Sequence, residues 1–148
     1  MLRILLDTSF ILPILGIDTG ITVRKVLEEL DSSSVEIYYS RFSILEAIWV
    51  ATKLIRKGSL DANRFFRGLR SIYASNRLMT VDEDPFIFEY ALKLYMIGHR
   101  DIIDNILYST ALHKDLKFLT SDEELVDFIK SKGLNRNVLL LPRDINVK

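Results

Sequence analysis

Short apolar runs alternate along the chain with longer stretches in which apolar residues recur every three or four positions. Short runs rich in Ile, Leu, Val, Phe or Tyr are typical of buried strands, whereas the longer period is typical of helices. Their alternation predicts an α/β domain with a mainly parallel sheet. The five expected strands cover residues 3–7, 35–39, 78–81, 117–120 and 138–141.

Signals for helix termini lie between the expected strands. Ser43 precedes an apolar run that continues through Ile55, and Asp84 followed by Pro85 is a favoured cap and first helical position. Gly133 is a favoured left-handed terminator for the last helix. We expect helices over residues 44–55, 60–75, 85–98, 102–113 and 123–133. The expected buried side of the second helix consists of Phe65, Phe66, Leu69, Ile72 and Tyr73.

The composition is that of one ordinary folded domain, which we take to span residues 1–148. Hydrophobic residues make up 49%, and 20 basic residues balance 20 acidic ones. The chain has no cysteine, which excludes disulfides and thiolate sites, and its two histidines argue against a histidine-built zinc site. The mean hydropathy of +0.16 is high for a monomer, so we expect a homodimer or another partner to cover apolar surface.

The first residues resemble the start of a secretory signal but do not complete one. Asp7 interrupts the apolar run, and no small-residue cleavage site follows Gly16. The chain contains no run of 18 consecutive apolar residues, the length that indicates a membrane span. We therefore expect a cytoplasmic protein with no membrane-spanning segment.

Carboxylates follow two of the expected strands. Asp7 ends the first strand, and Asp122 follows the fourth. Because the crevice of an open α/β sheet lies at the carboxyl ends of its strands, we expect these two side chains to meet. Each position also has a structural alternative, in which Asp7 or Ser9 caps a helix and Thr120 or Ser121 opens a capping box with a following glutamate.

Three more carboxylates lie on expected helices. Glu46 has almost only apolar neighbours, and a buried unpaired carboxylate is costly, so a metal ion or a basic partner is one explanation for it. A capping box formed by Ser43 and Glu46 is the other. Asp101 and Asp104 share a helical face, and we expect one of them to cap the helix. Asp104 precedes a long apolar stretch, so it is the better candidate for the crevice.

The order of these residues resembles the PIN domain, and in particular the toxin nucleases of VapC type. The corresponding positions are Asp7 at the first strand, Glu46 on the helix after the second, Asp104 before Asn-Ile-Leu-Tyr-Ser-Thr-Ala-Leu, and Asp122 in Leu-Thr-Ser-Asp. The resemblance covers residues 2–141 and departs from the family at Tyr108, where a small residue is usual. It implies a three-layer α/β/α sandwich with strand order 3-2-1-4-5, metal-dependent cleavage of RNA and, for a toxin, an antitoxin partner.

Carboxylates suit this chemistry because Mg²⁺ and Mn²⁺ prefer oxygen ligands. Four carboxylates carry more charge than one ion neutralises, so we expect one or two ions. Asp7, Asp104 and Asp122 are the expected ligands, directly or through water, and Glu46 is expected to hold a second ion or orient the attacking water. The expected hydrogen-bonding residues around them, for which turn and cap roles are the alternative, are Thr8, Ser9, Asp101, Thr120 and Ser121.

Basic residues are concentrated between Lys53 and Arg77, where seven of them accompany one acid. Arg64, Arg67 and Arg70 recur at every third position, and we call them the arginine row. We expect the arginine row to contact RNA phosphates, which would make binding depend on salt. An ordinary solvated helix face is the alternative.

Other α/β families fit the sequence less well. A haloacid-dehalogenase-like phosphatase needs a second aspartate two residues after the first one, where Ser9 stands. A response-regulator receiver needs an acidic pair before the end of the first strand, where Ile4, Leu5 and Leu6 stand. A catalytically inactive PIN-like module that binds RNA or protein is the remaining alternative, and the presence of all four acidic positions argues against it.

Overall fold

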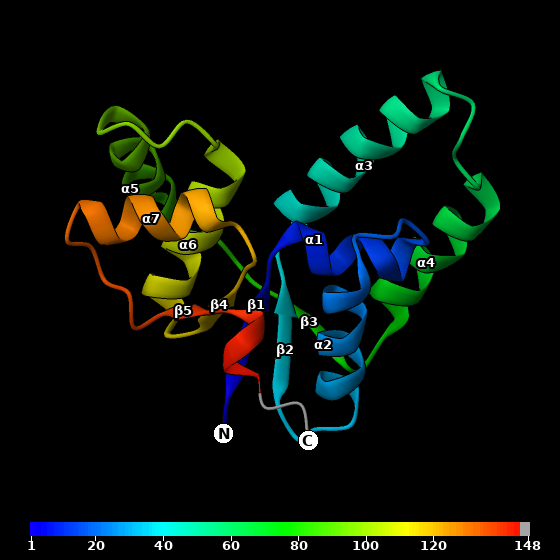
Figure 1. The fold of residues 1–148 in the computed structure, drawn as a ribbon, viewed down its shortest axis with the longest axis horizontal. Helices are drawn as coiled ribbons and strands as arrows, with labels where there is room; N and C mark the ends of the chain where they lie inside the picture. Colours follow the sequence, from blue (N-terminus) through cyan, green and yellow to red (C-terminus); the bar gives the residue numbers. More distant parts are fainter. Residues whose placement is uncertain (146–148) are drawn as a thin grey trace.

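The computed structural model describes residues 1–145, so residues 146–148 of the expected domain lie outside the described part. Its strands form one sheet with only parallel neighbours, in the order β3-β2-β1-β4-β5 (Figure 1). The predicted α/β class and the strand order implied by the resemblance are therefore confirmed. The strands are β1 (Arg3–Leu6), β2 (Glu36–Tyr39), β3 (Leu78–Thr80), β4 (Lys117–Leu119) and β5 (Leu139–Leu140).

Helices fill every connection between the first four strands and follow β4 as well. They are α1 (Thr8–Ile11), η1 (Leu12–Leu15), α2 (Ile21–Asp31), α3 (Arg41–Arg56), α4 (Ala62–Ala74), α5 (Pro85–Met96), α6 (Ile102–Lys114), α7 (Glu123–Ser131) and η2 (Pro142–Asp144). The five expected helices correspond to α3 to α7. Helix α2 was not predicted, although its buried residues Val23, Val26 and Leu30 have helical spacing.

The sheet lies between two layers of helices, because successive residues of a strand point to opposite faces. Ile4 and Leu6 of β1 join a core with α1, α2, α3 and α4 on one face. Leu5 and Phe118 join a second core with α5, α6 and α7 on the other face. The implied three-layer sandwich is therefore present, and Figure 1 shows α5, α6 and α7 gathered on the side of the sheet away from α2 and α4.

The expected start of the first helix is wrong. Helix α3 begins at Arg41, and its N-cap is Ser40, whose hydroxyl accepts a hydrogen bond from the Phe42 amide. Ser43 is therefore a buried residue inside the helix and forms no capping box with Glu46. Helix α7 begins at Glu123, as predicted, and its N-cap is Asp122, so the alternative capping box opened by Thr120 or Ser121 is absent as well.

The expected buried side of α4 is only partly correct. Phe65 and Ile72 are buried and Leu69 packs against the same core, but 50% of Phe66 and 64% of Tyr73 is exposed. Helix α4 lies very close to η1: an added Cβ at Gly68 would meet the backbone oxygen of Ile14 at 2.4 Å. Because the two helices approach each other so closely, η1 covers only one side of α4. The rings of Phe66 and Tyr73 lie outside the covered side.

All five strands point the same way, so their carboxyl ends lie along one edge of the sheet. The segments that leave this edge begin α1, α3, α5 and α7, and Figure 1 shows the first turns of α1 and α3 meeting at the upper end of the strands. Within residues 1–145, no helix combines the length and apolar character needed to cross a membrane.

Candidate active site at the carboxyl edge of the sheet

A cavity of about 300 Å³ opens at the carboxyl ends of β1 and β4, and we call it the acidic cavity. Its walls come from α1, α3, the first turn of α6 and the segment before α7. All four carboxylates predicted to be catalytic line it, together with four of the five residues predicted to surround them. The lining residues are Asp7, Thr8, Ser9, Leu12, Glu46, Val50, Asp101, Asp104, Ser121 and Asp122.

Asp7 is held in place by hydrogen bonds to both of its carboxylate oxygens. Oδ1 accepts the backbone amide of Thr8 at 2.6 Å, which makes Asp7 the N-cap of α1. Oδ2 accepts the hydroxyl of Thr120 at 2.8 Å. Thr120 therefore lies behind Asp7 and outside the cavity wall. Burial raises the pKa of Asp7 above its usual range, and the nearby carboxylates of Glu46 and Asp122 raise it further, while both hydrogen bonds oppose the shift.

The pair Asp101 and Asp104 divides as the sequence predicted. Asp101 caps α6, because its Oδ1 accepts the backbone amide of Asp104 at 3.1 Å. Asp104 itself is 5% exposed and lies within the first turn of the helix. Burial raises the pKa of Asp104 far above the usual range of an aspartate, and the charge of Asp7 and the adjacent Asp122 act in the same direction.

Asp122 is both a cap and part of the cavity wall. Its Oδ1 accepts the backbone amides of Glu124 and Leu125 at 3.0 and 3.3 Å. Its own backbone amide donates to the Thr120 hydroxyl, the group that also holds Asp7. Thr120 therefore fixes the positions of both strand-end aspartates relative to each other.

Glu46 reaches the cavity from the second turn of α3. Because that helix is capped by Ser40, the capping-box explanation for this glutamate is removed. Burial raises the pKa of Glu46, and the carboxylate of Asp101 adds to the shift, whereas the neighbouring Thr8 hydroxyl and Lys53 lower it. A nearby cation would stabilise the ionised form of a carboxylate in this position.

Two residues of the cavity wall, Thr8 and Ser9, have hydroxyl oxygens that are buried beneath its surface. The Thr8 hydroxyl lies close enough to the Glu46 carboxylate to lower its pKa by hydrogen bonding.

The donor set of the acidic cavity fits a hard divalent cation, because every polar side chain in it offers oxygen. The raised pKa values of Asp7, Glu46 and Asp104 have the sign that a missing positive charge produces. Within residues 1–145, no three acidic or histidine side chains already converge on one point as a closed metal site. Mg²⁺ needs no such cage, since it usually keeps several waters and takes one or two carboxylates.

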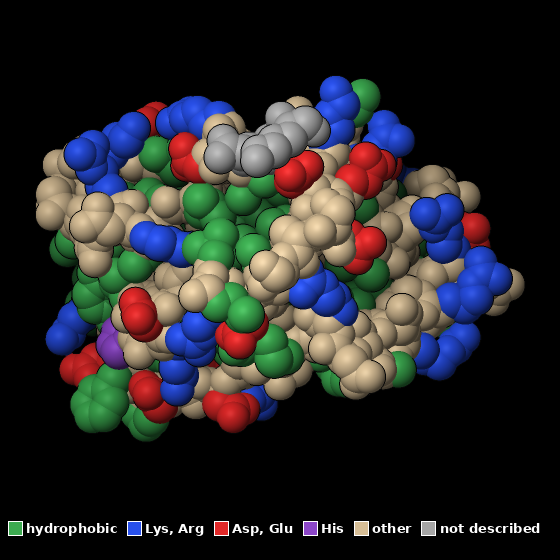
Figure 2. Space-filling model, turned by 90° about the horizontal axis from the view of Figure 1, so that it is seen from below, with side chains coloured by type: hydrophobic (Ala, Val, Ile, Leu, Met, Phe, Trp, Pro, Cys, Tyr) green, Lys and Arg blue, Asp and Glu red, His purple; other side chains and the backbone are tan. Residues whose placement is uncertain are grey.

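The arginine row lies outside the acidic cavity. All three guanidinium groups are exposed on α4, and within the described residues they form no salt bridge. Arg77 belongs to the same basic stretch but has a structural role, since its guanidinium donates to the carbonyls of Leu30, Ser33 and Val35 after α2. On the face at the amino ends of the strands, basic and acidic side chains are interspersed (Figure 2).

Sequence reasoning missed three neighbours of the site. Leu12 and Val50 form apolar parts of the cavity wall, and Lys53 lies near Glu46. Val50 and Lys53 follow Glu46 by one and two helical turns, so helical spacing alone would have found them. Tyr108, the position where the sequence departs from the family, is fully buried and donates its hydroxyl to the Asn135 carbonyl.

Similar folds occur among solved structures, whereas no curated protein matches the sequence. VapBC2 from Rickettsia felis bound to a promoter DNA fragment gives a TM-score of 0.64 at 15% identity, over 95% of this chain and 97% of that one. PAE2754 from Pyrobaculum aerophilum gives 0.65 at 15%, over 96% and 92%. A toxin–antitoxin complex from Klebsiella pneumoniae gives 0.63 at 17%, over 93% and 96%. The family model described as PIN domain matches residues 4–130, and the chain therefore belongs to the PIN domain family.

Proposed function

We propose that this PIN domain is a divalent-metal-dependent endoribonuclease. The observation that carries the proposal is the convergence of Asp7, Glu46, Asp104 and Asp122 on one cavity at the carboxyl edge of the sheet. Burial raises the pKa of three of them, so the cavity favours a ligand that brings positive charge. A carboxylate cluster of this type suits the hydrolysis of RNA phosphodiester bonds with Mg²⁺ or Mn²⁺.

The four carboxylates and Thr120 would have different roles in this reaction. Asp7, Asp104 and Asp122 would hold one or two Mg²⁺ or Mn²⁺ ions, directly or through water, and bound metal would supply an activated water and charge stabilisation at the phosphate. Glu46 would orient the attacking water or hold the second ion. Thr120 keeps the Asp7 carboxylate turned toward the cavity through its 2.8 Å hydrogen bond.

Four further groups border the reaction site in the proposal. The hydroxyls of Thr8 and Ser9 would hydrogen-bond the carboxylates or a phosphate oxygen from the wall of the acidic cavity. Asp101 and Ser121 complete the wall of the acidic cavity, Asp101 through its cap of α6. The arginine row would hold phosphates of the same RNA strand farther from the cut.

Protein partners form part of the proposal as well. Two of the similar structures are described as VapBC2 and as a toxin–antitoxin complex, which supports a toxin role with an antitoxin partner for this chain. Apolar side chains exposed on α5, among them Phe86, Leu92 and Met96, support a homodimer. We place the protein in the cytoplasm, where an RNA-cleaving toxin would meet its substrate.

The first test is cleavage of single-stranded RNA by the purified chain. We expect cleavage with Mg²⁺ or Mn²⁺ and none after EDTA is added. Asp104→Asn keeps the shape of the side chain but removes a charged ligand, so the cleavage rate should fall by about two orders of magnitude or more. Asp84→Asn is the matched control, because Asp84 caps α5 in the same manner as Asp122 caps α7 but does not line the acidic cavity.

Two outcomes would contradict the proposal. Full cleavage in EDTA would exclude the metal-dependent mechanism, and full cleavage by Asp104→Asn would move the reaction away from the acidic cavity. RNA binding without cleavage, with either metal, would instead identify the chain as an inactive PIN-like binding module.

A further inference from the structure

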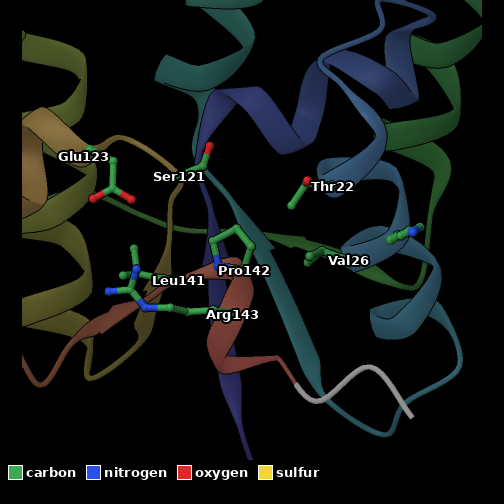
Figure 3. Close-up of a pocket in the computed structure, with 8 residues that line it drawn as sticks. Thr22, Val26, Ser121, Glu123, Leu141, Pro142 and Arg143 are labelled. Carbon is green, nitrogen blue, oxygen red and sulfur yellow. The ribbon is translucent and has the colours of Figure 1, made fainter.

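A second cavity, larger than the acidic one, lies directly beside it. Its volume is about 530 Å³, and one side is formed by Thr22, Lys25 and Val26, which share a face of α2. Figure 3 shows Thr22 and Val26 opposite Pro142, with Ser121 above Pro142 near the start of α1. The remaining lining residues are Glu123, Leu141 and Arg143. We call this cavity the Ser121 groove.

The Ser121 groove and the acidic cavity are continuous at one residue. Ser121 lines both of them, and the next residue, Asp122, belongs to the acidic cavity alone. A chain that passed over the carboxylates would therefore enter the groove as it left the acidic cavity on this side. Two other cavities in the described residues, one beside Arg77 and one beside Asn135, share no lining residue with the acidic cavity.

The chemistry of the groove matches that of a nucleotide. Pro142 and the small exposed parts of Val26 and Leu141 form an apolar floor, against which the face of a base can be buried. The hydroxyls of Thr22 and Ser121 can donate to or accept from a base edge or a ribose hydroxyl.

The charge of the groove also suits an RNA backbone. Lys25 and Arg143 are exposed and form no salt bridge with another described residue, which leaves two cations to hold phosphates. Glu123 is the one acid in the lining, so the two cations outnumber it.

We propose that the Ser121 groove binds the nucleotide next to the cleaved bond of a single-stranded RNA, with its base on the apolar floor and its phosphates at Lys25 and Arg143. The inference rests on the proposed ribonuclease function and adds to it a binding site for one nucleotide of the RNA. A base can reach the floor only when it is unpaired, so the groove selects single-stranded over double-stranded RNA.

Binding of a fluorescein-labelled single-stranded RNA oligonucleotide tests the groove, with cleavage suppressed by the Asp104→Asn substitution in every protein compared. The double variant Lys25→Ala/Arg143→Ala should flatten the dependence of log Kd on log salt by about 1.4, since each phosphate contact on a single strand contributes about 0.7. The matched control is Arg24→Ala/Arg136→Ala, which removes two exposed cations that do not line the groove and should leave the slope unchanged.

Thr22→Leu tests the groove without a change of charge and without adding an aromatic ring on which a base could stack. Thr22 is exposed in the first turn of α2, so the larger side chain narrows the groove without entering the core, and the hydroxyl is lost. It should weaken binding of the RNA about 10-fold and leave the salt slope as it was, because base contacts are lost and phosphate contacts are kept. A duplex of the same sequence should bind the unsubstituted groove more weakly than the single strand does.

The outcomes separate the groove from the ribonuclease proposal itself. If the chain cleaves RNA but the double variant and Thr22→Leu bind the oligonucleotide as tightly as their parent, the groove is not an RNA site. If the unsubstituted protein neither binds nor cleaves RNA, the proposed ribonuclease function is itself refuted, and the inference about the groove is refuted with it. Equal loss in the Arg24→Ala/Arg136→Ala control would also overturn the inference, because the effect would then be one of total charge.

Discussion

Replacing Asp104 by asparagine should stabilise the metal-free protein at neutral pH. In the folded chain, Asp104 is buried beside Asp7 and Asp122, and this environment raises its pKa well above the value in the unfolded chain. The folded state therefore keeps a proton that the unfolded state releases. Such a group contributes its stability below the unfolded-state pKa, near 4, and this contribution is lost as the pH rises toward the folded-state pKa.

The size of the effect follows from proton linkage. While the folded state holds one proton more than the unfolded state, the free energy of unfolding falls by about 1.4 kcal/mol for each pH unit. In a domain of this size, that loss corresponds to a fall in Tm of about 3 to 6 °C per pH unit. Asp7, whose pKa is also raised, adds to the slope at the acidic end of the range. The asparagine of Asp104→Asn does not titrate, so this variant lacks the contribution of Asp104 to the pH dependence of the free energy of unfolding.

Thermal melts in EDTA between pH 5 and pH 8 measure this effect. The Tm of the wild type should fall more steeply with pH than that of Asp104→Asn, and the variant should melt higher at pH 8. Asp84→Asn is again the control, because it alters an exposed helix cap outside the acidic cavity and should follow the wild-type slope. Added Mg²⁺ should raise the Tm of the wild type more than that of Asp104→Asn, since a ligand of the native state stabilises by mass action.

Parallel slopes for the wild type and Asp104→Asn would refute the reasoning, because the buried carboxylate would then carry no excess proton. A variant that melts lower than the wild type at every pH would show that Asp104 is a structural hydrogen-bonding residue. An equal Mg²⁺ response in both proteins would remove Asp104 from the metal site.

Three further predictions concern surfaces and packing. Replacing the arginine row by alanine should flatten the salt dependence of RNA binding by about 0.7 for each residue, and an unchanged slope would identify the row as an ordinary solvated face. Met96→Glu, at a position that is 78% exposed on α5, should convert the proposed homodimer to monomer in size-exclusion chromatography with light scattering, and a monomeric wild type would reject the dimer. Gly68→Ala should lower the free energy of unfolding in urea by about 2 kcal/mol, because its Cβ would meet a backbone oxygen of η1 at 2.4 Å, and unchanged stability would show that α4 can move away.

The sheet could be predicted from the sequence because a parallel strand buried on both faces is a short apolar run that stands out from its surroundings. The proline after Asp84 and the glycine at 133 marked helix ends correctly for similar reasons, since each residue type fixes a backbone conformation. Gly133 does adopt a positive φ of 65° at the end of α7.

Helix α2 was missed because its start carries no side-chain signal. Gly20 occupies the N-cap position, and no side chain there accepts a backbone hydrogen bond. The exposure of Phe66 and Tyr73 was missed for a different reason. Helical spacing tells which residues share a side of α4, but the width of the side that η1 covers is set by tertiary packing.

The division of Asp101 and Asp104 into a cap and a cavity residue could be predicted. For Asp7 the sequence left capping and a site role as alternatives, and it did not indicate Asp122 as a cap. Asp7, Asp101 and Asp122 each use Oδ1 to accept a backbone amide at the start of a helix. Each of them also lines the acidic cavity. Among the described residues, the Oδ2 atom of Asp101 accepts no hydrogen bond, so it remains available to a ligand. The Asp122 side chain is hydrogen-bonded to Asp104 when that carboxyl is protonated, and loss of the proton would release it.

Capping and ligand binding are therefore two uses of one carboxylate in this fold. In a parallel sheet, each strand ends where the next helix begins, so a residue that caps the helix necessarily stands at the carboxyl edge. The cap holds one oxygen still and directs the carboxylate, and the positive end of the helix dipole partly offsets its charge before any metal arrives. Asp104 caps nothing: it lies within the first turn of α6, and burial and the neighbouring carboxylates oppose its charge. Glu46 caps no helix either, but the pKa of Asp104 is raised much further above its usual range. Asp104 is therefore the position where metal removal and charge neutralisation should have the largest effect.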